Sequence, residues 1–151
     1  MMRHRISAGT LTLREGKVLL VHHVRPGVHD FWVGPGGGVE GAETLGEAAE
    51  RETFEETGLR VRAGRVAYVE ELVDDTTRSL KFWFLADYVS GGIDTAANPA
   101  EDESIIEAGW FEPNDLPAGL IFPPVLRDRF WSDVETGFPA PVFLPVRRAI
   151  V

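Results

Sequence analysis

The chain contains no cysteine. Disulfides, zinc–thiolate sites and cysteine nucleophiles are therefore excluded. Long apolar runs are also lacking, and no stretch approaches the roughly 20 residues that a bilayer-spanning helix needs. The N-terminus shows no signal-peptide pattern. We therefore expect no membrane partner and a cytoplasmic location.

Positive charge is scarce, because 15 Lys and Arg residues face 24 Asp and Glu residues, for a net charge of −9. This balance argues against a nonspecific nucleic-acid binder, which usually carries a basic patch, and we expect no stable nucleic-acid partner. A phosphorylated ligand remains compatible, because a bound metal ion can supply the missing positive charge. The 151 residues, 44% of them hydrophobic, suffice for one domain with a core of its own.

The segment from Gly37 to Leu59 reads GGVEGAETLGEAAERETFEETGL. Helical spacing places Glu52, Glu55 and Glu56 on one face. Three carboxylates on a half-buried face repel one another and are costly to desolvate. A hard divalent cation such as Mg²⁺ or Mn²⁺ is the simplest compensation. The alternative is a solvated glutamate patch on a surface helix, which leaves the glycine-rich turn Gly34–Gly38 unexplained.

This segment resembles the Nudix box, G-x5-E-x7-R-E-U-x-E-E-x-G-U, in which U is a bulky apolar residue. The matching residues are Gly37, Glu43, Arg51, Glu52, Glu55, Glu56, Gly58 and Leu59. The first U position departs, because it holds Thr53, which we expect to weaken packing behind the helix slightly. The resemblance implies an α/β/α sandwich with a mixed sheet between helices. It extends loosely over residues 6–127 and does not cover the tail after Phe130.

The pattern along the chain agrees with an α/β class and one domain over residues 1–151, with 136–151 as a C-terminal tail of uncertain role. Thr44 and Glu47 predict a capping box at the start of the box helix, and Gly58 a left-handed end. A loop is expected over Arg25–Asp30. Further expected elements are strands over Ile6–Leu13, Val18–Val24, Arg65–Val73, Leu80–Val89 and Ile105–Phe111, and a helix over Pro123–Glu135.

Hydrolysis of a phosphoanhydride needs a positioned water and neutralised phosphate oxygens, and a divalent metal serves both needs. We predict Glu52 and Glu56 as ligands of the main ion, with Glu55 binding a second ion or orienting water. The resemblance adds the backbone carbonyl of Gly36. The expected cofactor is Mg²⁺, with Mn²⁺ as a substitute.

The base that activates water has two candidate sources. One is Glu55, if it binds metal only loosely. The other is the acidic loop Glu101–Glu103, within which Glu103 is favoured because it lies closer to the following strand. The predicted catalytic residues are therefore Glu52, Glu55, Glu56 and Glu103.

Three residues are candidates for substrate binding. Arg25 follows His22 and His23 at a strand end, where at most one of the two histidines can face a substrate. Trp83 lies either against a nucleotide base or in a second buried face. Arg51 is either a phosphate clamp or, as the resemblance implies, a structural partner of Glu43.

The leading hypothesis is a Mg²⁺-dependent pyrophosphohydrolase of a nucleoside diphosphate derivative: a nucleoside triphosphate, a nucleotide sugar or a dinucleotide. The alternative is a nucleotide-sensing module without turnover, which loss of a box glutamate would favour. Isoprenoid diphosphate isomerase chemistry on the same fold is disfavoured, because this branch of the family resembles enzymes that use a cysteine and the chain has none. The expected partner is a small nucleotide-type molecule, and self-association as a homodimer is left open.

Overall fold

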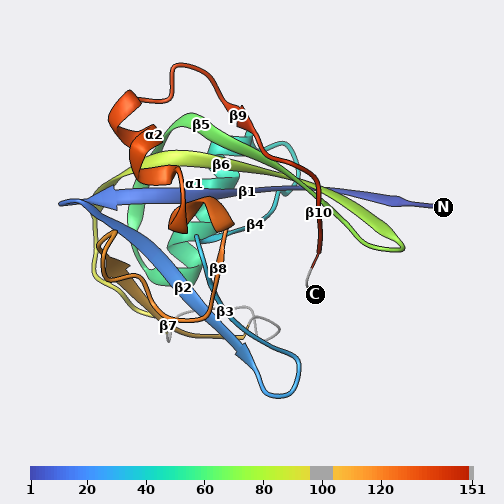
Figure 1. Ribbon diagram of the computed structural model, residues 1–151, viewed down its shortest axis with the longest axis horizontal. Helices are drawn as coiled ribbons and strands as arrows, with labels where there is room; N and C mark the ends of the chain where they lie inside the picture. The colour runs from blue at the N-terminus through green and yellow to red at the C-terminus, as the bar shows by residue number, and fades with distance from the viewer. Residues whose placement is uncertain (96–103, 150–151) are drawn as a thin grey trace.

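A computed structural model of the chain describes residues 1–95 and 104–149 (Figure 1). Within these residues, ten strands form one mixed sheet in the order β10-β5-β6-β1-β2-β3-β8, with β4 beside β1, β7 beside β2 and β9 beside β5. The strands are β1 (Arg3–Arg14), β2 (Lys17–Arg25), β3 (His29–Val33), β4 (Gly36–Gly38), β5 (Arg60–Val73), β6 (Thr77–Ser90), β7 (Ile105–Phe111), β8 (Leu120–Phe122), β9 (Val142–Phe143) and β10 (Arg147–Arg148). The helices are α1 (Leu45–Thr57), the 3₁₀ turn η1 (Pro124–Arg127) and α2 (Phe130–Thr136).

The two faces of the sheet are covered by different helices, which confirms the expected α/β class with a mixed sheet between helices. Ala48 and Ala49 of α1 pack with Phe84 on one face. Leu126 of η1 and Phe130 of α2 belong to a second cluster, which also contains Trp83. Successive strand residues point to opposite faces, so Phe84 and Trp83 belong to different layers.

The sheet divides into two arms at the β1–β2 hairpin. Its turn residues Glu15 and Gly16 both have positive φ, 51° and 77°, as two-residue hairpins prefer. β1 and β2 pair only beside this turn. Beyond it, β1 runs parallel to β6 while β2 pairs with β3 and β7, and the arms separate in Figure 1. The glycine strand β4 pairs with β1 at Ser7–Gly9.

Helix α1 begins and ends as the sequence predicts. The Glu47 amide donates to Thr44 Oγ1 at 3.1 Å, and the Thr44 amide donates to Glu47 Oε1 at 2.8 Å. Gly58 ends the helix with φ of 80°. These contacts satisfy backbone groups that a helix end leaves without intrahelical partners.

Thr53, the residue that departs from the box pattern, is fully buried. Its hydroxyl donates to the Ala49 carbonyl at 2.8 Å and lies 2.9 Å from Thr10 Oγ1, which receives the Thr12 hydroxyl at 2.9 Å. Thr10 of β1 therefore provides a partner for the hydroxyl that stands in place of an apolar side chain.

Two expected elements differ in the structure. The helix expected over Pro123–Glu135 is divided into η1 and α2, because Asp128 leaves helical geometry with φ of −131° and ψ of −104°. Apolar spacing alone cannot detect this break, since Leu126 and Phe130 are buried on both sides of it. The expected loop Arg25–Asp30 is also shorter, because β2 reaches Arg25 and β3 begins at His29. None of the described helices has the length and apolar character that crossing a membrane requires.

Candidate functional site

Two box glutamates are buried on the inner face of α1. Glu52 and Glu56, one turn apart, are 7% and 2% exposed, whereas the Glu55 side chain at the edge is 38% exposed. Burial raises the pKa of Glu52, and hydrogen bonding and charge from Arg51 oppose that change. The helix therefore holds carboxylates where water screens them poorly.

The glycine strand β4 lies directly against these carboxylates. The Gly36 amide donates to Glu56 Oε1 at 3.3 Å. A Cβ on Gly37 would lie 2.6 Å from the Glu52 carboxyl carbon, and one on Gly36 would lie 3.2 Å from Lys81 Nζ. Only glycine permits so close an approach of backbone. The Gly36 backbone is thus placed between a buried carboxylate and an ammonium group.

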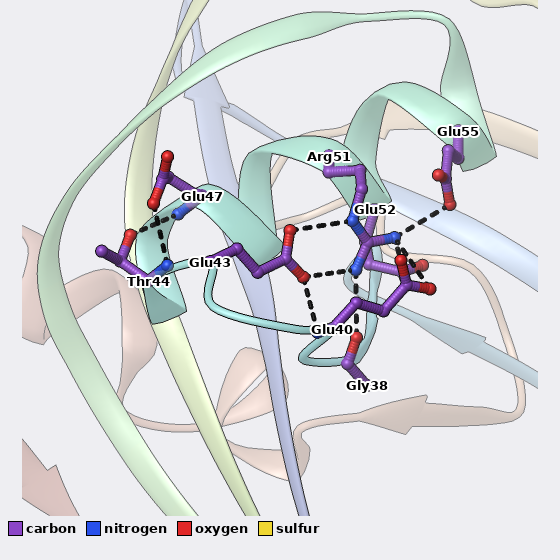
Figure 2. Close-up of polar contacts among 8 residues, drawn as sticks. All are labelled: Gly38, Glu40, Glu43, Thr44, Glu47, Arg51, Glu52 and Glu55. Carbon is purple, nitrogen blue, oxygen red and sulfur yellow. Dashed lines mark hydrogen bonds and ion pairs between the residues drawn. The ribbon is translucent and has the colours of Figure 1, made fainter.

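Arg51 ties the helix to the preceding loop, as Figure 2 shows. It donates to both carboxylate oxygens of Glu43, at 3.1 and 2.8 Å, and to the Gly38 carbonyl at 3.0 Å. Nη1 also donates to Glu52 at 3.0 Å and to Glu55 at 3.1 Å. The expected pairing of Arg51 with Glu43 is confirmed. A role as a phosphate clamp would require Arg51 to leave these partners.

The donors at this site fit a hard divalent cation, since Glu52, Glu55, Glu56 and the Gly36 carbonyl offer oxygen only. Among residues 1–95 and 104–149, however, no three His, Asp or Glu side chains are gathered closely enough to hold a metal ion. Arg51 accounts for part of this, because it attracts Glu52 and Glu55. Metal binding therefore requires these two carboxylates to turn from Arg51.

A cavity of about 410 Å³ has Lys81 in its wall, and the Nζ of this residue lies next to Gly36. Burial lowers the pKa of Lys81, while the charges of Glu56 and Glu70 act in the opposite direction. The basic residues in the wall are Arg3, Arg5, Lys81 and Arg147, and the aromatic residues are Phe31, Trp83 and Phe122.

Trp83 contributes to the cavity wall but is 1% exposed. Its indole Nε1 donates to Glu70 Oε1 at 2.7 Å. A Cβ on Gly9 or Gly34 would lie 2.7 or 2.6 Å from the six-membered ring of Trp83. The indole is thus closely packed by backbone, and little of its surface is available for stacking with a base.

The other predicted substrate residues lie apart from this cavity. Arg25 is exposed at the end of β2, next to the β2–β3 turn, and is not among the described residues that line the cavity. His22 stacks on Trp32 and lies 2.6 Å from Asp30, whereas His23 stacks on Phe31. The candidate base Glu103, with Glu101 and Asp102, lies outside the described residues.

Sequence reasoning missed the four basic residues of the cavity wall: Arg3, Arg5, Lys81 and Arg147. Lys81 could have been found from strand alternation, because it is two residues before Trp83 and shares its face. Arg5 extends β1 beyond the predicted strand. Arg147 reaches the cavity only through tail pairing, which no local pattern indicates.

Comparison with known proteins identifies the family. The NUDIX domain model matches residues 3–129, and the chain belongs to the Nudix family. It is 40% identical over 113 residues to the NAD-capped RNA hydrolase NudC of Salmonella paratyphi C, covering 74% of this chain and 39% of that protein. The matched segment therefore covers well under half the length of this relative.

Solved structures agree on the fold. A NUDIX hydrolase from Nitrosomonas europaea aligns with a TM-score of 0.74 and 23% identity, over 99% of this chain and 81% of the other. The MutT protein from Methanosarcina mazei Go1 aligns with a TM-score of 0.70 and 26% identity, over 90% of this chain and 97% of the other.

Proposed function

We propose that this chain is a divalent-metal-dependent hydrolase that cleaves a phosphoanhydride bond in a nucleoside diphosphate derivative. The observation that carries the proposal is the buried pair Glu52 and Glu56, which lies against the β4 backbone, close to a cavity that Lys81 lines. Family membership supports it. We further infer that residues 1–151 act as one domain in the cytoplasm; pairing of the tail with β5 supports the single domain.

The chain's own groups divide into those that would hold metal and those that attract phosphate. Glu52, Glu55, Glu56 and the Gly36 carbonyl would hold Mg²⁺ or Mn²⁺. When bound, such an ion neutralises phosphate oxygens and lowers the pKa of bound water. Lys81, next to Gly36, adds positive charge in the wall of the cavity and helps to orient a phosphate there.

The reaction transfers a phosphoryl group to water. The water oxygen bonds to phosphorus, the bond from phosphorus to the bridging oxygen breaks, and the leaving phosphate keeps the bonding electrons. A carboxylate base removes the water proton. Glu55 is the most accessible of the three proposed metal-binding carboxylates, and Glu103 remains the second candidate for the base.

The substrate is proposed as a nucleoside triphosphate, a nucleotide sugar or a dinucleotide. A relative named as an NAD-capped RNA hydrolase, at 40% identity, favours a dinucleotide-type diphosphate and adds capped RNA to the set to be tested. The net charge of −9 argues against broad affinity for the RNA body. A substrate recognised at its diphosphate end agrees with both observations.

The test is a hydrolysis panel of these nucleotides with Mg²⁺, Mn²⁺ or excess chelator. Glu52→Gln and Glu56→Gln should lower turnover by orders of magnitude. The matched control is Glu40→Gln, which changes a carboxylate at a variable position of the box whose side chain is 73% exposed. Mg²⁺ should also raise the melting temperature of the unmodified protein and not of Glu52→Gln. Tight nucleotide binding without turnover under any metal would replace this proposal with a nucleotide-sensing module.

A further inference from the structure

The C-terminal tail completes the edge of the sheet next to the cavity. Arg147 lies beside Leu72 of β5 in a parallel register. The Leu144 amide donates to the Val69 carbonyl at 3.0 Å, and the Ala149 amide donates to the Val73 carbonyl at 2.8 Å. Figure 1 shows the tail extending along β5. This segment lies beyond residue 129, where the family match ends.

Alternation along β10 separates two neighbouring arginines. Arg147 lines the cavity and its side chain is 25% exposed. Arg148 is directed elsewhere: its side chain is 67% exposed and pairs with Asp75 at 2.7 Å. The tail therefore offers a natural comparison between two adjacent arginines.

The Arg147 guanidinium is held in a fixed orientation. Its Nε donates to Glu70 Oε2 at 3.0 Å, and its Cζ lies 4.6 Å from the Phe122 ring centroid. The other Glu70 oxygen accepts from Trp83, and Glu70 is only 2% exposed. Within the described part of the chain, the Nε contact is the one side-chain hydrogen bond of Arg147, so both terminal nitrogens are available to a ligand.

The charge around Arg147 favours an anion. Arg3, Arg5 and Lys81 line the same cavity. Of the acidic lining residues, Glu70 is engaged by Trp83 and Arg147, and Asp74 accepts hydrogen bonds from the amides of Thr76 and Thr77. A cavity wall with four cations is notable in a chain of net charge −9.

We propose that Arg147 is a substrate-binding residue. The tail holds Arg147 in the cavity wall, where its two terminal guanidinium nitrogens bind a phosphate group of the nucleotide. A guanidinium fork matches two phosphate oxygens, and Arg is favoured over Lys for such contacts. The ion pair with Glu70 and the contact with Phe122 orient the fork before the ligand arrives, which reduces the entropy lost on binding. That the ligand is a substrate rests on the proposed function, whereas phosphate binding rests on the basic residues that line the cavity.

The experiment measures binding apart from turnover. The probe is α,β-methylene-ADP, whose diphosphate linkage resists hydrolysis, titrated calorimetrically in Mg²⁺, with adenosine as the phosphate-free comparison. Arg147→Gln should raise the Kd for α,β-methylene-ADP about tenfold or more and leave that for adenosine within about twofold. Arg148→Gln, on the same strand, is the matched control and should change neither.

Arg147→Lys covers the case in which Arg147→Gln does not fold. It keeps the charge and can still pair with Glu70, but loses the fork, and should weaken α,β-methylene-ADP binding about threefold or more. Equal affinities in the Arg147 and Arg148 variants would overturn the inference, as would an equal loss of adenosine binding or no binding of α,β-methylene-ADP by the unmodified protein. Absence of hydrolysis across the panel, with phosphate binding still lost in Arg147→Gln, would refute the proposed function and uphold this inference.

Discussion

Replacing Arg51 by alanine should destabilise the protein strongly. The guanidinium donates five hydrogen bonds of 2.8 to 3.1 Å, four of them to the carboxylates of Glu43, Glu52 and Glu55. A hydrogen bond to a charged group contributes about 1.5–3 kcal/mol, and such contributions do not add. Breaking a buried ion pair costs about 3–5 kcal/mol.

The Arg51 site is not fully buried, which reduces this magnitude. The Arg51 side chain is 23% exposed and that of Glu55 is 38% exposed, although that of Glu52 is 9% exposed. Allowing for solvent screening, we expect a loss of about 2–4 kcal/mol in the free energy of unfolding. In a domain of this size that corresponds to a melting temperature lower by about 5–15 °C.

The assay is urea denaturation in chelator at neutral pH, together with steady-state kinetics in Mg²⁺. Arg51→Lys keeps the charge without the fork and should fall between the alanine variant and the unmodified protein. Arg62→Ala, which removes an exposed arginine on β5, is the control and should change stability by less than about 0.5 kcal/mol. Mg²⁺ should stabilise the Arg51→Ala protein more than the unmodified one, because Glu52 and Glu55 then lack the guanidinium group that balances their charge. An unchanged melting temperature with a much raised KM would refute this reasoning and identify Arg51 as a phosphate clamp.

Three further predictions concern other parts of the molecule. Glu55→Gln and Glu103→Gln, compared by kcat at saturating Mg²⁺, identify the base: a collapse in Glu55→Gln alone places it on α1, and a collapse in Glu103→Gln alone places it in the loop. Burial, with the charges of neighbouring cationic groups, lowers the pKa of His23 from 6.5 to about 4. Neutral His23 therefore contributes its full stabilisation above pH 6.5, and this stabilisation is lost as the pH falls toward 4. This amounts to about 2 kcal/mol between pH 8 and pH 5; His23→Phe should show a correspondingly smaller loss in urea denaturation, and an identical pH dependence would contradict the assignment. Thr53→Val should cost about 1–3 kcal/mol, because the buried Thr10 hydroxyl loses its acceptor; a stabilised variant in thermal denaturation would show that packing outweighs this hydrogen bond.

The local features of the box helix were predictable from the sequence because they depend on residues a few positions apart. The cap formed by Thr44 and Glu47 and the left-handed end at Gly58 satisfy backbone groups within one turn. Arg51 pairs with Glu43, eight positions earlier, across the first turns of α1, and the family resemblance anticipated this pairing. Alternation along a strand likewise predicts that the neighbours Phe84 and Trp83 lie on opposite faces of β6, where the structure places them.

The cavity was decided by tertiary structure. Lys81, Arg5 and Arg147 come from three strands, and strand pairing over long sequence separations brings them to one face. No local periodicity records which strands become neighbours, because pairing depends on how the whole sheet closes around its core. The tail illustrates the same limit: its last strand has only two residues, too few for a pattern, and hydrogen bonding to β5 gives it its place. The sequence by itself therefore determined the chemistry of the box, whereas the packing of distant strands determined which cations surround the cavity beside it.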